Sequence, residues 1–222
     1  MSSVLATPKP RSLVSLADLL RRLGGIAPGR LLLHPPPGTA KEKHVIEIHD
    51  REGRLCELVD GVLVEKIMAA KESLFASVII QFMGPYADDR DLGVVLGADG
   101  MLRLRPRLVR IPDVSFISWD RIPSGEFPDD PIPDLVPDLA VEVLSKGNTK
   151  GEMQLKLKEY FAAGVRLVWY IDPKERVVDV YTSPTEFRRY RNGQTIDGGA
   201  VLPGFKLSLR TLFARTRRRS TR

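Results

Sequence analysis

The sequence lacks several features that would each place it in a particular class of protein. It has one cysteine, Cys56, in 222 residues, so no disulfide can form within the chain. No secretory signal pattern opens it and no apolar run reaches the length of a membrane span, so we expect a cytoplasmic protein. The patterns GxGxxG and GxxxxGK[ST] are absent, which argues against dinucleotide binding and P-loop chemistry. The three histidines form no zinc-ligand pattern with the cysteine.

Composition favours a folded, basic protein. Apolar residues make up 43% of the chain, which is enough for a substantial core. The net charge is +6 and the pI is about 9.5, which favours an acidic partner such as nucleic acid. Six arginines lie in the final stretch RTLFARTRRRSTR, which we expect to be a solvated, mobile end.

The chain divides into three predicted parts. Residues 1–40 read as an N-terminal helical appendage, capped by Ser15, followed by a proline-rich linker. Residues 41–213 form the main domain, and residues 214–222 form a basic tail. Residues 1–11 are expected to be loose.

The first half of the main domain is predicted to be rich in strands. HVIEIHD (residues 44–50) alternates like a strand, and Asp60-Gly61 predicts a two-residue hairpin turn. Residues 69–86 read as a helix whose inward side chains include Leu74, Val78 and Phe82. From Gly93 onward a further strand pair is expected, with LVRIPDVSFIS pairing antiparallel to it, and the proline-rich segment 118–137 is expected at the surface.

The second half predicts a crossover unit. DLAVEVLS and RLVWYID read as strands covered on both faces, and a helix over residues 149–163 connects them. Such a unit has parallel strands, and hairpins add antiparallel edges, including a last pair made by EFRRYR and residues 201–209. The expected fold is therefore an α/β domain with a mixed sheet flanked by few helices. Trp119 and Trp169 are expected to be packing anchors.

Three residues of this region point to chemistry: Asp113, Glu142 and Lys156. Two acids on adjacent strands can share a divalent cation, and a nearby ammonium can stabilise the oxygen that attacks a phosphate. Alternation places Glu142 on the same face of its strand as Ala140 and Leu144, where a lone carboxylate needs a partner or a metal.

Each candidate also has a structural interpretation. Lys156 would be a boundary lysine paired with Glu152 or Glu159, and Asp113 a turn cap after a proline. Lys146 and Lys150 are also near enough in sequence to reach the site.

Four blocks in order carry a resemblance to a known family: CELVDGVLVEK, VRIPDVSFIS, PDLAVEVLS and KLKEYFAAGVRLVWYIDP, followed by LPGFKLSLRTLF. They resemble the Uma-type restriction-endonuclease-like family, a branch of the PD-(D/E)XK nuclease superfamily. The resemblance implies a restriction-endonuclease-like core in which Asp113 and Glu142 bind Mg²⁺ or Mn²⁺. Leu144 stands where the superfamily usually has lysine, and Lys156 resembles a lysine relocated to the following helix. Ser73 lies near a position where the family commonly has histidine.

The resemblance extends to Glu57, which would complete the metal shell or orient a water; its alternative is an exposed strand residue beside the hairpin. A run of arginines ahead of Asp113 either holds the phosphates that flank the cut or protects a strand edge: Arg103, Arg105, Arg107 and Arg110.

These observations predict a metal-dependent endonuclease that hydrolyses phosphodiester bonds of a nucleic acid, with DNA as the expected substrate. Lys156 would position the attacking water or help to deprotonate it. A homodimer is expected because cutting two strands takes two sites. The alternative is a non-catalytic nucleic-acid-binding or interaction module on a nuclease fold. The displaced lysine and the absent histidine favour that alternative.

Overall fold

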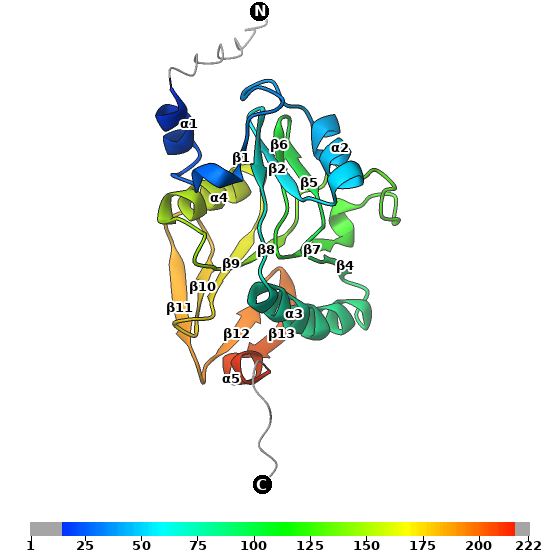
Figure 1. Ribbon diagram of the computed structural model, residues 1–222. Coiled ribbons are helices and arrows are strands. Elements are labelled where there is room, and N and C mark those ends of the chain that lie inside the picture. The colour runs from blue at the N-terminus through cyan, green and yellow to red at the C-terminus, as the bar shows by residue number, and fades with distance from the viewer. Residues whose placement is uncertain (1–14, 216–222) are drawn as a thin grey trace, which may run out of the picture.

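A computed structural model of the chain describes residues 15–215 (Figure 1). The predicted loose segment 1–11 and residues 216–222 of the predicted basic tail lie outside the described residues. The helices of the described part are α1 (Leu16–Arg22), α2 (Glu42–Glu52), α3 (Ala70–Asp88), α4 (Lys150–Ala163) and α5 (Leu209–Ala214). None of them is both long and apolar enough to cross a membrane.

The strands form three sheets where the sequence predicted one. A five-stranded sheet has the order β1-β3-β2-β6-β5, made by β1 (Leu31–Leu32), β2 (Cys56–Val59), β3 (Val62–Glu65), β5 (Leu102–Arg105) and β6 (Leu108–Arg110). A six-stranded sheet has the order β11-β10-β9-β8-β7-β4, made by β4 (Gly93–Leu96), β7 (Val114–Ser118), β8 (Leu139–Val143), β9 (Leu167–Asp172), β10 (Val177–Tyr181) and β11 (Phe187–Arg191). A separate hairpin consists of β12 (Thr195–Gly198) and β13 (Leu202–Ser208).

The predicted crossover unit is confirmed. Strands β8 and β9 are parallel neighbours, and α4 connects them. The side chain of Thr149 caps the start of α4 by accepting a hydrogen bond from the backbone N–H of Glu152, and Gly164 ends the helix in a left-handed conformation. Helix α4 covers one face of the six-stranded sheet, and α3 covers the other (Figure 1).

The alternation predicted for β8 is also confirmed. Leu139, Val141 and Val143 pack in the core on the α3 side. Ala140 and Leu144 pack in the core on the α4 side, so Glu142 faces α4 as well. This alternation determines which helix can contribute to a site around Glu142.

Strand β6 and strand β7 are consecutive in sequence but belong to different sheets. β6 pairs with β5 and β2, whereas β7 pairs with β4 and β8. The predicted pairing of residues 93–97 with residues 101–106 is wrong, because β4 and β5 lie in different sheets. The predicted antiparallel pairing of LVRIPDVSFIS is present but divided, since β6 pairs with β5 and β7 pairs with β4. The break falls at Pro112, which has no N–H to donate, so Asp113 lies where the two sheets meet. The final pair is also different, since β11 pairs with β10 and β13 pairs with β12.

The predicted hairpin is present, and the predicted strand before it is wrong. Asp60 and Gly61 connect β2 and β3 with φ values of 50° and 86°, as a two-residue turn with positive φ requires. The segment predicted as a strand from its alternation forms α2 instead. Val45 and Ile48 are three residues apart, a spacing that also suits one face of a helix, and Val45 is fully buried.

Two predictions of burial need correction. Leu74 is 42% exposed, and α3 instead turns Phe75, Ile79 and Met83 into the core. The proline-rich segment predicted at the surface also buries Ile132 and Leu135. Trp169 is fully buried and Trp119 is partly buried against the core, which confirms both as packing residues.

The N-terminal segment packs against the rest of the described chain. Leu19 of α1, Leu23 directly after it and Ile26 lie in the same core cluster as Leu157 of α4. β1 adds a strand to the five-stranded sheet by pairing with β3. The residues predicted as an appendage and linker thus contribute to the core and to a sheet.

Candidate active site

Asp113 and Glu142 line the same cavity. β7 and β8 pair antiparallel with Val114 opposite Val141, and this register brings Asp113 beside Glu142. The backbone N–H of Val143 donates to Oδ2 of Asp113 at 2.7 Å, and both acidic residues are 5% exposed. The cavity also contains the side chains of Lys66, Glu72 and Lys156.

Lys156 is held between two carboxylates. Its Nζ lies 3.0 Å from Oε1 of Glu142 and 3.0 Å from Oε1 of Glu57. The hydroxyl of Tyr160, one turn along α4, donates to the same Oε1 of Glu142 at 2.5 Å. The predicted alternative pairings of Lys156 are wrong, because Glu152 pairs with Arg30 and Glu159 pairs with Arg110.

Glu57 lies behind Lys156. Its side chain is fully buried, so the interpretation as an exposed strand residue is wrong. The pairing of Leu58 with Val109 places Glu57 beside Arg110, whose Nη1 donates to Oε2 of Glu57 at 2.6 Å. Glu57 does not line the cavity that Asp113 and Glu142 share. Its contacts orient Lys156 and neutralise part of the charge of that amine.

Burial and neighbouring charges shift the pKa values of this cluster in opposite directions. Burial raises the pKa of Glu142, and Asp113 adds to the rise, which Lys156 only partly offsets. Burial also acts to raise the pKa of Glu57, but the charges of Lys156 and Arg110 outweigh burial and hold that pKa well below its usual range. Burial acts to lower the pKa of Lys156, but Glu142 and Glu57 outweigh it and raise that pKa. Lys156 is therefore an ammonium ion at neutral pH.

The structure adds two residues that the sequence analysis did not select. Lys66 follows β3, and its Nζ lies 2.9 Å from Oδ1 of Asp113 and donates to the carbonyl oxygen of Ile111 at 2.5 Å. Glu72 is in the first turn of α3, and its Oε2 is buried without a hydrogen-bonding partner among residues 15–215. Lys66 ends the block ELVDGVLVEK, so a lysine directly after a buried hairpin strand was the available signal. Glu72 had none beyond its place at a helix start.

The predicted phosphate-binding arginines have partners inside the protein. Arg103 forms a bidentate pair with Glu42, and Arg105 pairs with Asp60. Arg107 donates to two backbone carbonyl groups. Arg110 is 3% exposed and lies between Glu57 and Glu159, and this burial argues against a phosphate contact by Arg110.

The oxygen donors around the cavity would suit Mg²⁺ or Mn²⁺, and they do not enclose a metal as the ligands of a structural metal site do. Within residues 15–215, no three His, Cys, Asp or Glu side chains are grouped as a metal cluster. Mg²⁺ needs no such cluster, because it is commonly held by one or two carboxylates together with waters and substrate phosphate. Both hydrogen bonds of the Glu142 carboxylate use Oε1, which leaves Oε2 without a partner in the described part of the chain. Asp113, Glu142 and the unpartnered oxygen of Glu72 thus offer hard oxygen ligands on one cavity.

The cavity is small and adjoins a larger one. Its volume of about 20 Å³ holds roughly one water-sized ligand. The larger cavity, of about 460 Å³, shares Arg30, Ile67, Glu72, Ser145 and Asn148 with it.

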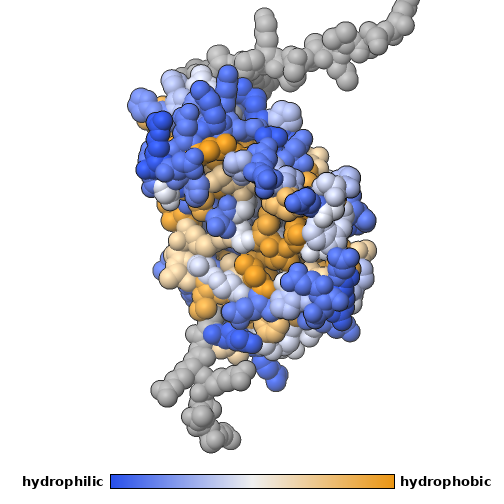
Figure 2. Space-filling model, turned by 90° about the vertical axis from the view of Figure 1, so that its right-hand side faces the viewer, coloured by the Kyte–Doolittle hydropathy of each residue, from blue (hydrophilic) through white to orange (hydrophobic). Residues whose placement is uncertain are grey.

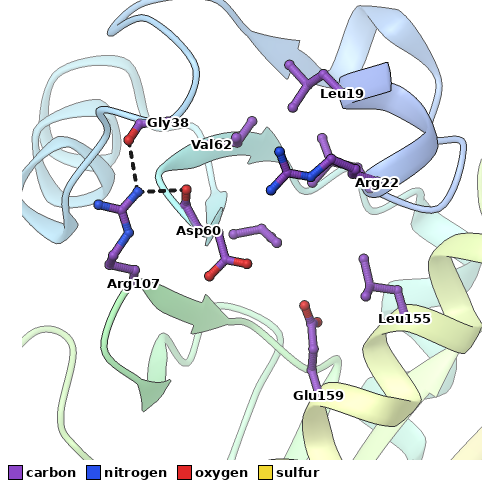
Figure 3. Close-up of a pocket in the computed structure, with 10 residues that line it drawn as sticks. Leu19, Arg22, Gly38, Asp60, Val62, Arg107, Leu155 and Glu159 are labelled. Carbon is purple, nitrogen blue, oxygen red and sulfur yellow. Dashed lines mark hydrogen bonds between the residues drawn. The ribbon is translucent and has the colours of Figure 1, made fainter. Parts of the chain in front are cut away.

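A third cavity lies away from these carboxylates (Figure 3). It has a volume of about 110 Å³ between α1, the hairpin turn and α4. Arg22 points into it from α1, and Leu155 and Glu159 line it from α4. Arg107 is fixed at its rim by hydrogen bonds of 2.8 Å to the carbonyl oxygens of Gly38 and Asp60. Its charged lining residues are Arg22, Asp60, Arg107 and Glu159, and none of them is a lysine.

The mixed α/β fold is that of a restriction-endonuclease-like protein. The chain is a member of the Uma2 family, described as "Putative restriction endonuclease", whose family model matches residues 42–210. This confirms the resemblance found in the sequence. A solved structure with a similar fold is described as a "putative nuclease belonging to DUF820 from Anabaena variabilis". It has 20% sequence identity and a TM-score of 0.62, and the similarity covers 72% of this chain and 90% of that one. The comparison with curated proteins gave no match.

Proposed function

We propose that this protein is a metal-dependent endonuclease that hydrolyses phosphodiester bonds of nucleic acid, with DNA as the expected substrate. The observation that carries the proposal is the single cavity on which Asp113 and Glu142 meet two buried amines, those of Lys66 and Lys156. Membership of the family described as "Putative restriction endonuclease" supports it.

Asp113 and Glu142 would hold the cation, and Glu72 lines the same cavity. The bound Mg²⁺ or Mn²⁺ would supply a lowered pKa for water and positive charge for the scissile phosphate. Asp113 is fixed for this role by the backbone N–H of Val143, and Glu142 by the hydroxyl of Tyr160. These bonds limit the rotamers of both carboxylates before any ligand arrives.

Lys156 would act through its charge. The sequence alone left open whether this amine positions the attacking water or helps to deprotonate it. A lysine with a raised pKa remains protonated, so the first role is the one that the surroundings of Lys156 support. An ammonium ion held at a fixed place stabilises negative charge that develops on phosphate oxygens. Lys66 would do the same from the Asp113 side of the cavity.

One observation favours the alternative, a non-catalytic nucleic-acid-binding or interaction module. Lys66 and Lys156 already form close ion pairs with Asp113 and Glu142. Such pairs would compete with a cation for the same oxygens, and a protein that never binds a metal would keep them. Metal binding therefore separates the two functions.

The test combines calorimetry with plasmid nicking. We expect Mg²⁺ or Mn²⁺ to bind the wild-type protein and to support nicking that EDTA abolishes. Glu142→Gln should lower both metal affinity and nicking at least about 100-fold, which is within the range for loss of a group that stabilises the transition state. Glu186→Gln is the matched control, because Glu186 is exposed. Absence of metal binding, or nicking that Glu142→Gln leaves unchanged, would refute the proposal.

The homodimer and the cytoplasmic location stay predictions. For the homodimer, the structure offers an edge: β4 lies at one end of the six-stranded sheet, and its residues Val94, Val95 and Leu96 are half-buried. On the right-hand side of Figure 1, hydrophilic residues cover the upper and lower parts of the surface and apolar residues gather between them (Figure 2). Light scattering of the purified protein would measure the oligomeric state directly.

A further inference from the structure

The larger cavity beside the active site has a strongly basic rim. Three lysines line it from separate segments: Lys71 from the first turn of α3, Lys146 from the segment between β8 and α4, and Lys174 from the turn between β9 and β10. All three are exposed, and Glu72, which also lines the active-site cavity, is the single acid among the residues that line this one.

These lysines differ from the predicted arginines in having no strong partner. Within residues 15–215, no carboxylate lies within ion-pairing distance of the amines of Lys71 or Lys146. Lys174 lies 3.8 Å from its exposed neighbour Glu175, a contact worth little in water. Like charges gathered around one cavity with few counter-charges repel one another, and a bound polyanion relieves this repulsion.

Apolar side chains accompany the lysines along the same surface. Ile67, at the lip shared by the two cavities, is 64% exposed. The basic surface continues into a neighbouring cavity of about 440 Å³, which also contains Lys71 and adds Arg176 and the 42% exposed Leu74. Amines for phosphates next to apolar contacts for sugars and bases suit a nucleic-acid strand.

We propose that Lys71, Lys146 and Lys174 bind the phosphates that flank the scissile bond, and that the strand runs along this lysine rim. The inference rests on the proposed function, because it places the substrate of that same site. It replaces the arginines around Arg105 as the principal phosphate contacts. Since the lysines reach backbone phosphates only, the binding they support is independent of base sequence.

The test is the salt dependence of binding, measured in EDTA so that no cutting occurs. The binding constant falls as salt rises, and each lost phosphate contact on duplex DNA makes the slope of log K against log salt shallower by about 0.9. The triple variant K71A/K146A/K174A should therefore have a slope shallower by about 2 to 3, measured by fluorescence anisotropy with a labelled duplex. The matched control is K43A/K158A/K206A, which removes the same charge from exposed lysines that do not line this cavity. Its slope should stay near that of the wild type.

Three outcomes would overturn the inference: equal losses in both triple variants, no loss in either, or no binding of DNA or RNA by the wild type. All six lysines are exposed, so both variants should melt at the wild-type temperature. The outcome also separates the two proposals. Metal-dependent nicking without lysine-dependent binding would refute phosphate binding by the lysine rim and support the nuclease function. Lysine-dependent binding without nicking in any metal would support phosphate binding by the rim and refute the nuclease function.

Discussion

Lys66 and Asp113 form a buried ion pair at the junction of the two main sheets. Nζ of Lys66 lies 2.9 Å from Oδ1 of Asp113, and each side chain is 7% exposed. Lys66 follows the hairpin of the five-stranded sheet, and Asp113 precedes the first residue of β7 in the six-stranded sheet. The pair therefore links the two sheets at the residue we propose as a metal ligand.

Lys66→Met should destabilise the protein and respond to metal. The substitution leaves the carboxylate of Asp113 buried without its partner, which typically costs about 3–5 kcal/mol of unfolding free energy. Mg²⁺ should restore part of that loss if the cation binds Asp113. Urea unfolding with and without Mg²⁺ measures both effects.

Two further variants make this prediction specific. Lys43→Met changes an exposed lysine in the same way and should stay within about 0.5 kcal/mol of wild type. Lys66→Met combined with Asp113→Asn should be less destabilised than the sum of the single variants, with a coupling of about 1–3 kcal/mol. Strict additivity would mean that the pair contributes nothing to folding.

The sequence predicted the centre of this site and missed its surroundings for a physical reason. Glu142 could be selected because a charge inside an apolar pattern is costly without a partner, and the family resemblance supported Asp113 and Lys156 beside it. Lys66 and Glu72 lie at the ends of elements, where charged residues are usually solvated, so their local patterns carry no such signal. Their burial follows from how the two sheets meet, which depends on contacts between residues far apart in the chain.

The hydrogen bonds to the buried carboxylate of Asp138 predict a pH dependence of stability. Its carboxylate accepts hydrogen bonds from the backbone N–H of Ser118 and from Arg121 and Arg166. Burial acts to raise the pKa of Asp138, but the bonds from Ser118 and Arg121 outweigh it and lower the pKa. The stabilisation is therefore complete above the unfolded-state pKa of about 3.9 and disappears as the pH falls through the lower folded-state pKa.

Asp138→Asn should accordingly lose about 1.5–3 kcal/mol near pH 7, the usual range for hydrogen bonds to a charged group. The difference from wild type should shrink as the pH falls below about 4. Denaturant unfolding over a pH series measures this difference. Asp120→Asn, at an exposed carboxylate of the same region, should show no such trend. A difference that stays constant with pH would show that the charge of Asp138 is not the cause.

The two neighbouring residues Leu74 and Phe75 test which face of α3 is buried. Phe75 is 1% exposed and packs edge-to-face against Phe213 at 5.7 Å between ring centroids. Phe75→Ala should therefore cost about 3–5 kcal/mol. Leu74→Ala should change stability much less, by about 0.5 kcal/mol, because Leu74 is 42% exposed and lies outside the core. Thermal or urea unfolding of both variants measures the two losses of stability. Equal losses would contradict this orientation of the helix.

Local sequence patterns predicted the helices and strands better than they predicted which strands pair with one another. The hairpin at Asp60-Gly61 and the crossover through α4 follow from turn chemistry and chain connectivity, and both are present. The segment of residues 44–50, predicted as a strand, is a helix. Its apolar positions fit the period of a strand and that of a helix, and the packing of Val45 against the five-stranded sheet favours the helix. The division into separate sheets was not predictable from alternation, which is the same whichever neighbour a strand has.

The docking of the N-terminal segment rests on a close contact between two glycines. A Cβ at Gly151 in α4 would lie 2.4 Å from the carbonyl oxygen of Gly24, closer than side-chain atoms approach backbone. That same oxygen accepts a hydrogen bond of 2.7 Å from the hydroxyl of Thr149. Gly151→Ala should push α1 away from α4 and cost about 1–3 kcal/mol, as overpacking usually does.

Limited trypsin digestion measures the displacement directly, because Arg21 and Arg22 lie at the end of α1. Cleavage there should be faster in Gly151→Ala than in wild type. Gly84→Ala is the control: a Cβ at Gly84 meets nothing within 4 Å, so it should leave cleavage unchanged and stabilise the protein by about 0.4–1 kcal/mol. Equal cleavage of Gly151→Ala and wild type would mean that the segment is an appendage, as the sequence predicted, because a docked segment could not absorb the clash without moving.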